Sequence, residues 1–196
     1  MKPSRYHPGL VALHWFLAAF IVLALGLGMF VLKTIPNSSP HKIEALRAHM
    51  FGAAVIFTLM IVRLALRRFS ARPEPATTGN RALDRIAGIS HLAFYGLVAG
   101  MIATGLATAV LADLPSIVFG GSGAPLPDSF AVFPTRVIHG VIAKIFVALI
   151  AVHATAALFH HFVLGDGLLK RMWFGRRWPA RQGNLAERVP ARSRAT

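Results

Sequence analysis

The chain has 196 residues, of which 55% are hydrophobic and only 14% are charged. A soluble domain usually carries about 25% charged residues because water must wet its surface, so the composition excludes an ordinary soluble domain. The basic residues that give the net charge of +14 lie between and after long apolar blocks. Insertion into membrane lipid explains this distribution better than binding to nucleic acid does. Cysteine is absent, which excludes disulfides, thiolate-bound iron–sulfur clusters and haem attached through a C-x-x-C-H motif.

Four apolar blocks follow one another along the chain, and each approaches or exceeds the roughly 20 residues that a helix needs to cross a bilayer. Helices are expected because every backbone polar group in hydrocarbon must be satisfied inside the segment. The blocks predict helices at about residues 10–32, 48–68, 84–112 and 136–164. The expected fold is all-α, an integral membrane four-helix bundle over residues 1–178, with a basic and disordered tail at 179–196.

Lysine and arginine are distributed unevenly between the two sides of this bundle. Most lie in the N-terminal segment, in the loop between the second and third helices, and in the tail. The opposite side carries Lys33, Lys42, Arg47 and Arg136. By the positive-inside rule, both termini are expected in the cytoplasm. The first block is too long for a signal peptide core and lacks an A-x-A cleavage site, so we expect it to be retained.

Histidine dominates the ionisable residues within the apolar stretches of these helices, residues 10–32, 49–66, 86–112 and 137–164, which contain no Asp or Glu. These histidines are His14, His49, His91, His139, His153, His160 and His161, and the two cations in the blocks are Arg63 and Lys144. A single membrane histidine is more often a hydrogen-bonding residue between helices than a ligand. Seven in four helices favour a function, because polar groups are costly in a bilayer.

The expected topology sorts four histidines into two pairs by depth. His14 lies about one turn into a helix that starts in the cytoplasm, whereas His49 and His139 begin helices that start on the outer side. His153 follows His139 by fourteen residues, which is about 21 Å along a helix. We therefore expect His49 to meet His139 on the outer side and His14 to meet His153 on the inner side. Each pair joins two helices, as bis-axial ligation of a haem iron requires, and this predicts two haem b groups.

Other polar residues are candidates for the surroundings of these haems. Haem propionates need cations, and Arg63 suits the inner haem while Arg136 suits the outer one. His160 shares a helix face with His153 and is either the alternative ligand on the inner side or a residue beside the quinone or the haem. For His91, a place in a quinone pocket or beside a propionate is open, and so is a simple packing role.

Several strings around these histidines resemble a known family. They are Leu13-His14-Trp15, Ala48-His49, the stretch 60–67, Ile138-His139 and the stretch 153–161. Over roughly residues 5–173 the chain resembles the bacterial cytochrome b561 family, small di-haem quinone oxidoreductases of the inner membrane. The resemblance implies iron ligands at His14, His49, His139 and His153 and ubiquinone as a substrate. Because some members oxidise superoxide, it also implies superoxide as a donor at the periplasmic side.

These features predict a one-electron conduit from a donor, either superoxide or a periplasmic redox protein, through the haems to ubiquinone. Such an oxidoreductase needs no catalytic side chain beyond the haem. If superoxide is the donor, the outer cations would attract it. The alternative is a cytochrome b subunit that anchors a partner dehydrogenase or hydrogenase and accepts its electrons. A metal-ion transporter is disfavoured, because such proteins usually employ intramembrane carboxylates.

The sequence leaves several properties of this conduit open. These are the physiological donor, the direction of flow, the quinone site, the role of Lys144 and the oligomeric state.

Overall fold

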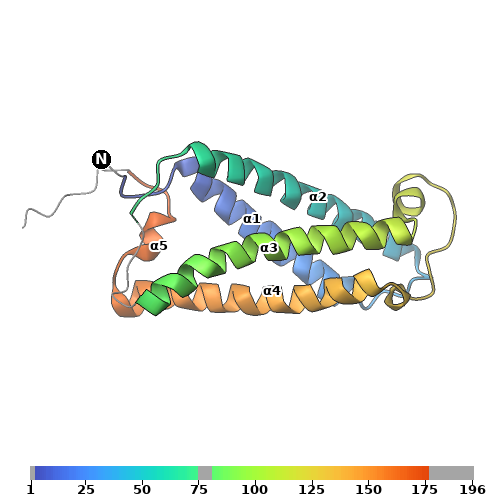
Figure 1. The fold of residues 1–196 in the computed structure, drawn as a ribbon. Coiled ribbons are helices and arrows are strands. Elements are labelled where there is room, and N and C mark those ends of the chain that lie inside the picture. The colour runs from blue at the N-terminus through green and yellow to red at the C-terminus, as the bar shows by residue number, and fades with distance from the viewer. Residues whose placement is uncertain (1–2, 75–80, 177–196) are drawn as a thin grey trace, which may run out of the picture.

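The computed structural model describes residues 3–74 and 81–176, and within these ranges the regular secondary structure is helical, with no β-strand. The basic tail expected at 179–196 lies outside the described residues. Four long helical stretches run side by side along one axis (Figure 1). Each of the four is long and apolar enough to cross a membrane. The expected all-α, four-helix membrane fold is confirmed.

Two of the long stretches are single α-helices and two continue as a short π-helix. They are α1 (Pro8–Gly26) with η1 (Leu27–Val31), α2 (Pro40–Phe69), α3 (Arg81–Leu111), and α4 (Pro134–Phe159) with η4 (His160–Leu164). Three short helices lie outside the long stretches: η2 (Pro115–Phe119) and η3 (Phe130–Val132) between α3 and α4, and α5 (Leu168–Arg171) after η4. The start of α1, the end of α4 and helix α5 all lie at one end of the bundle (Figure 1).

Helix α2 begins at Pro40, earlier than the start near residue 48 that the apolar block suggests. Pro40 occupies the first turn of the helix, where a missing N–H removes no hydrogen bond, and Ser39 before it has an extended backbone. The added turns carry Ile43 and Leu46, which pack against the loop after α3. The expected outer loop is therefore shorter, because its second half is helical.

The helices form two closely packed pairs, α1 with α2 and α3 with α4, and contacts between the pairs are sparser. Buried apolar side chains from all four helices meet in the middle of the bundle. They are Leu17, Leu25, Ile56, Val98, Ala143 and Phe146, which we call the central cluster. A continuous apolar cluster of this kind excludes water from the middle of the bundle.

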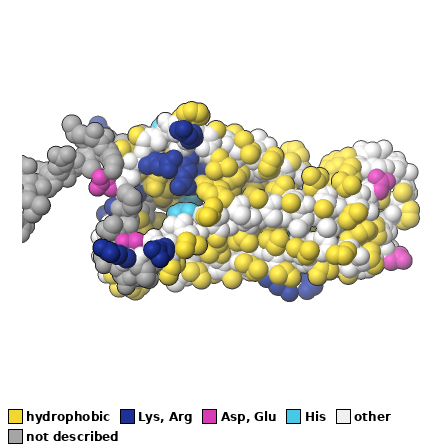
Figure 2. All heavy atoms as spheres, viewed as in Figure 1, with side chains coloured by type: hydrophobic (Ala, Val, Ile, Leu, Met, Phe, Trp, Pro, Cys, Tyr) yellow, Lys and Arg dark blue, Asp and Glu magenta, His cyan; other side chains and the backbone are white. Residues whose placement is uncertain are grey.

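The outer surface of the bundle is apolar along most of its length, as expected for helices that face lipid. Figure 2 shows hydrophobic side chains covering the middle of the visible face, while many of the visible Lys and Arg side chains gather near the end that holds α5. Large apolar residues such as Leu92 and Phe51 are 72% and 68% exposed. This charge distribution is what the positive-inside rule expects of a cytoplasmic end, and the orientation itself stays a prediction.

The opposite end of the bundle is covered by the loop between α3 and α4. Buried residues of this loop and of the adjoining helices, among them Ala112, Leu114, Val118 and Leu126, form one cluster with Leu46. Arg47 fixes the loop by donating from Nε and Nη2 to the Val118 carbonyl oxygen at 3.1 and 2.7 Å. The loop therefore forms a packed cover over this end rather than a loose connection.

Candidate functional site

His49 and His139 face each other across the two helix pairs near the covered end. His49 comes from α2 and His139 from α4, and their ring centres are 6.3 Å apart with an interplanar angle of 73°. The rings belong to helices of different pairs, so each projects into the space between α1–α2 and α3–α4. This is the outer pair expected from the sequence.

Small residues on neighbouring helices lie directly behind the two rings of the outer pair. A Cβ added at Gly28 of η1 would lie 3.5 Å from His49 Cε1, and one added at Gly105 of α3 would lie 3.3 Å from His139 Cε1. The Thr104 hydroxyl lies 3.0 Å from His139 Nδ1. A hydrogen bond at Nδ1 fixes the orientation of an imidazole and leaves Nε2 available for a metal. His49 Nδ1 is buried and has no partner among the described residues.

His14 and His153 form the inner pair at the other end of the central cluster. His14 comes from α1 and His153 from α4, and their ring centres are 6.5 Å apart with an interplanar angle of 65°. Two further rings from α3 lie against His153: His91 at 5.9 Å and Phe94 at 5.1 Å between ring centres. Phe94 also contacts Phe146 of the central cluster. Two rings of α3 therefore pack against the inner pair at His153.

Both separations fit two imidazoles that share one iron. Two rings bound through nitrogen to opposite sides of a metal, with bonds of about 2.0–2.1 Å, have ring centres roughly 6.4 Å apart. The observed 6.3 and 6.5 Å agree with this value. Within the described ranges, no three His, Asp or Glu side chains are grouped to hold a metal ion. Each position thus presents two facing imidazoles, the number that a bis-histidine haem takes.

Arginines lie on α2 and α4 at the two depths predicted for the propionates. Arg63 of α2 donates from Nη1 to the Leu10 carbonyl oxygen at 3.3 Å, one turn before His14 on α1. Arg136 of α4 extends along its own helix, so that its Nη1 would lie 3.2 Å from a Cβ added at Gly140, the residue after His139. Each arginine thus lies next to a helix turn that carries a histidine of the corresponding pair.

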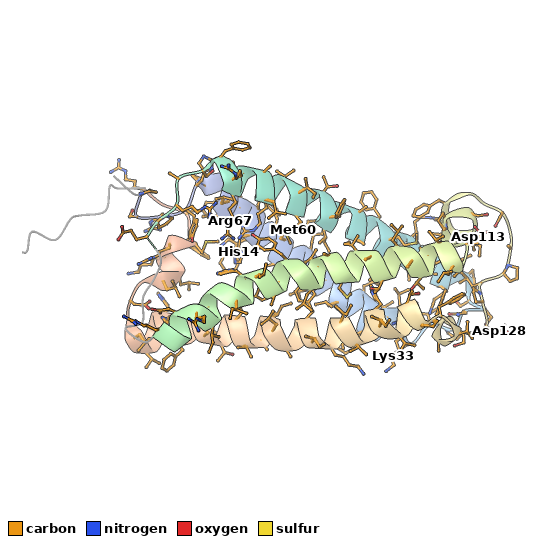
Figure 3. All side chains as sticks on the ribbon, viewed as in Figure 1. His14, Lys33, Met60, Arg67, Asp113 and Asp128 are labelled. Carbon is orange, nitrogen blue, oxygen red and sulfur yellow. The ribbon has the colours of Figure 1, made fainter. Side chains whose placement is uncertain are left out.

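A second arginine and a tyrosine adjoin the inner pair. Arg67 donates to the Tyr95 hydroxyl at 3.0 Å and lies 5.9 Å from the centre of its ring. Figure 3 shows Arg67 and His14 near the same end of the bundle, with Asp113 and Asp128 at the other end. The inner pair is therefore close to several polar side chains.

The remaining sequence candidates occupy different places. His160 lies in η4, and its Nδ1 is 2.5 Å from Asp166 Oδ2. No ring contact joins it to His14 or His153 among the described contacts. Slight burial acts to raise the pKa of Asp166, but hydrogen bonds from His160 and the Leu168 N–H, together with the charge of Arg171, hold that pKa below its ordinary value. Lys144 lies within α4 and is exposed.

Comparison with known proteins gives one consistent result. A family model described as prokaryotic cytochrome b561 matches residues 5–175. Cytochrome b561 homolog 2 of Escherichia coli strain K12 is 30% identical over 175 residues, which cover 87% of this chain and 92% of that protein. Cytochrome b561 homolog 1 of the same strain is 25% identical over 171 residues, which cover 86% of this chain and 97% of that protein.

Proposed function

The chain belongs to the prokaryotic cytochrome b561 family, and on that premise we propose that it is a di-haem cytochrome that passes electrons from a one-electron donor to ubiquinone. Membership makes it a multi-pass haem b protein of the bacterial inner membrane with a role in electron transfer. The observation that supports two haems is the matching ring separation of two independent histidine pairs.

The proposed roles of the residues follow from their positions. His49 and His139 hold the outer iron, and His14 and His153 hold the inner iron. Arg63 and Arg136 are the proposed cationic partners of the propionates, because carboxylates in an apolar bundle need charged hydrogen-bond donors. Haem b, when bound, supplies a centre that accepts and releases one electron at a time. The central cluster between the pairs keeps water out of the path.

The proposed reaction requires protons as well as electrons at the site where ubiquinone binds. Ubiquinone becomes ubiquinol by taking two electrons and two protons, so a one-electron donor must act twice. If superoxide is the donor, two superoxide anions lose one electron each and leave as two molecules of dioxygen. His91, which lies beside His153, is the proposed polar residue at the quinone end.

The outer cations differ in how available they are to an incoming anion. Lys42 is only 5% exposed, and its Nζ donates to the carbonyl oxygens of Leu32 and Ile35. Arg47 is engaged with Val118. Lys33 is exposed and is the clearest candidate for attracting superoxide. Superoxide oxidation at low ionic strength should slow in Lys33→Gln and stay unchanged in Arg68→Gln at the opposite end, and an equal rate in both variants would remove Lys33 from this role.

Haem stoichiometry tests the di-haem proposal. The purified protein should contain two haem b groups, seen in reduced-minus-oxidised spectra. His49→Ala and His139→Ala should lose the same spectral component, and His14→Ala and His153→Ala the other. His41→Ala is the matched control, since this exposed residue contacts only Glu44 among the described charged groups, at 3.6 Å. One haem per wild-type chain, or a spectrum unchanged by these alanines, would contradict the proposal.

A further inference from the structure

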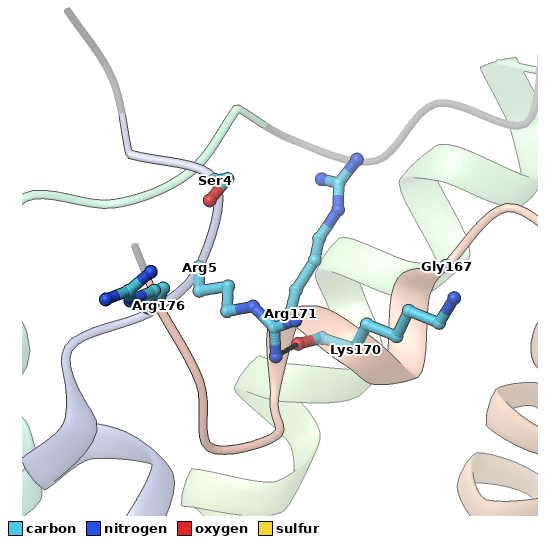
Figure 4. A pocket seen from close by; sticks show the side chains of 6 residues that line it. All are labelled: Ser4, Arg5, Gly167, Lys170, Arg171 and Arg176. Carbon is cyan, nitrogen blue, oxygen red and sulfur yellow. Dashed lines mark hydrogen bonds between the residues drawn. The ribbon is translucent and has the colours of Figure 1, made fainter. Parts of the chain in front are cut away.

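A cation-lined pocket of about 330 Å³ lies outside the histidine pairs, at the end of the bundle that carries α5 (Figure 4). The residues that line it are Ser4, Arg5, Gly167, Lys170, Arg171 and Arg176. They come from the segment before α1 and from α5 with its flanks, so both ends of the described chain contribute. None of them has a role in the proposed electron transfer.

Hydrogen bonds between these two segments give the pocket a defined wall. Arg5 Nη1 donates to three backbone carbonyl oxygens in and just after α5, those of Lys170, Phe174 and Trp173, at 2.9, 3.2 and 3.3 Å. The Tyr6 N–H donates to the Arg171 carbonyl oxygen at 3.2 Å. Hydrogen bonds to backbone groups thus join the segment before α1 to the segment around α5. The backbone that carries the cationic side chains is therefore fixed.

Among the described residues, the lining of the pocket carries four cations and no carboxylate. Asp166, next to Gly167 in the chain, is already bonded to His160 and to the Leu168 N–H. Arg171 donates from Nη1 to the Glu74 carbonyl oxygen at 2.7 Å, which is a neutral acceptor. A phosphate group, with several oxygens for Arg and Lys donors, matches this lining.

Exposed aromatic residues next to the pocket place it at the depth of lipid headgroups. Trp173 and Phe174 follow α5 and are both 55% exposed. Trp15 packs on Trp173 with ring centres 5.6 Å apart and donates from Nε1 to the Met172 carbonyl oxygen at 2.9 Å. Tryptophan is enriched at the boundary between hydrocarbon and water. Acyl chains would find apolar surface here, which a free inorganic anion would not use.

We propose that this pocket binds the phosphate of an anionic phospholipid from the adjoining leaflet. Basic pockets beside membrane helices are suited to such headgroups, and each nearby Lys or Arg adds to the attraction. The bound lipid would bridge the start of α1 and the segment after α4, two parts of the chain that lie far apart in sequence. The proposal rests on the membrane-spanning fold and is independent of how many haems the protein holds.

Native mass spectrometry of the full chain tests the proposal. The protein is reconstituted in nanodiscs of equal parts phosphatidylcholine and phosphatidylglycerol, released, and examined for retained lipid. The wild type should retain phosphatidylglycerol in preference. Lys170→Gln with Arg171→Gln should weaken this retention by about tenfold or more, since two attracting charges are lost. Arg5 is left intact because it holds the backbone of the pocket.

Matched controls decide between the pocket and the general charge of this end of the protein. Arg68→Gln with Arg85→Gln removes the same charge from exposed residues outside the pocket, and it should retain the lipid. The Lys170 ammonium has no hydrogen-bond partner among the described residues. The single variant Lys170→Gln should therefore show an intermediate loss of retained phosphatidylglycerol. Unchanged haem absorbance shows that each variant is folded. Equal losses in both double variants, or no preference in the wild type, would overturn the proposal.

A competition arm separates a lipid headgroup from a free anion. Inorganic phosphate at millimolar concentration should leave the retained phosphatidylglycerol in place, because it cannot use the aromatic surface beside the pocket. Displacement of the lipid by inorganic phosphate would assign the pocket to a soluble anion and would overturn the lipid proposal.

Discussion

The two histidine pairs have nearly the same ring separation but very different surroundings. Behind the outer pair lie Gly28 and Gly105, and the Thr104 hydroxyl lies next to His139 Nδ1. The inner pair is instead flanked by the rings of His91 and Phe94 on one side of His153. The outer pair also lies under a packed loop, whereas the inner pair lies near the polar end of the bundle.

This difference shows that one separation of two histidine rings can be maintained in two ways. At the outer pair the absence of side chains on neighbouring helices lets the rings approach, and a hydroxyl orients one of them. At the inner pair large rings fill the space and hold His153 in place. Substitutions on α3 near the two pairs should therefore affect only one haem each, and for different physical reasons.

The largest effect is expected from filling the space behind His139. Gly105→Leu should displace the His139 ring, because even a Cβ at this position would lie 3.3 Å from Cε1. We expect loss of most of the outer haem with the inner haem retained, measured as haem per protein and by reduced spectra. Gly96→Leu on the same helix is the control, since a Cβ there would meet no atom within 4 Å. Equal loss in both variants would show that bulk on α3, not contact with His139, is responsible.

A smaller effect is expected from removing the hydroxyl next to His139. Thr104→Val keeps the shape of the side chain but removes one hydrogen-bond partner of His139 Nδ1, so the orientation of the ring is less well fixed. Loss of such a partner typically lowers metal affinity by about 10–100-fold, and haem release to apomyoglobin measures it. Thr108→Val is the control, because its hydroxyl contacts Thr135 and a backbone carbonyl oxygen instead of a histidine. Faster release from the control alone would refute the role of Thr104.

A change confined to the inner haem is expected from His91→Phe. Both ligands of the inner pair remain, so haem content should stay at the wild-type level. Removing a polar ring beside His153 should shift the midpoint potential of the inner haem and lower the rate of ubiquinone reduction, by less than about tenfold. Redox titration and stopped-flow reduction measure the two quantities. His161→Phe is the control, since the His161 ring packs on Phe162. Loss of a haem in His91→Phe would instead identify His91 as a ligand.

The smallest effect concerns the contact of η4 with the segment that leads to α5. The lowered pKa of Asp166 means that its ionised form is favoured in the folded state. Its contribution to stability is therefore present above the ordinary Asp pKa and is lost as the pH falls through the folded value. Asp166→Asn should lower the thermal midpoint slightly at pH 7, and the difference from wild type should shrink below about pH 4. A difference that grows in acid would contradict this assignment.

The pairing of the four histidines shows how far the sequence alone reaches. In a helix the rise per residue is constant, so the topology of the spans is enough to assign His14, His49, His139 and His153 to two depths. The structure brings the same four residues together in the same two pairs. Nothing about side-chain packing was needed for this prediction, because depth along a membrane helix is fixed by the count of residues.

Other parts of the site depend on lateral packing, which residue counting does not provide. His91 had no identifiable partner in the sequence, because its neighbour His153 belongs to α4 and only the α3–α4 contact brings them together. The sequence likewise does not indicate a role for Thr104, because its neighbour His139 also belongs to α4. The apolar block does not reveal the early start of α2, because its first turn carries the polar residues His41, Lys42 and Glu44 beside Pro40, a composition that resembles a loop.

The sequence by itself determined the membrane class, the four helical spans and the depths of the histidines, since each follows from hydropathy and helix rise. Tertiary structure decided which helix faces meet. It grouped the helices into two pairs, placed glycines behind one histidine pair and rings beside the other, and brought Arg5 to the backbone of α5. The physical reason is that the rotation of one helix against another depends on how all the side chains of a bundle interlock. That interlocking is a property of the assembled fold and of no single segment.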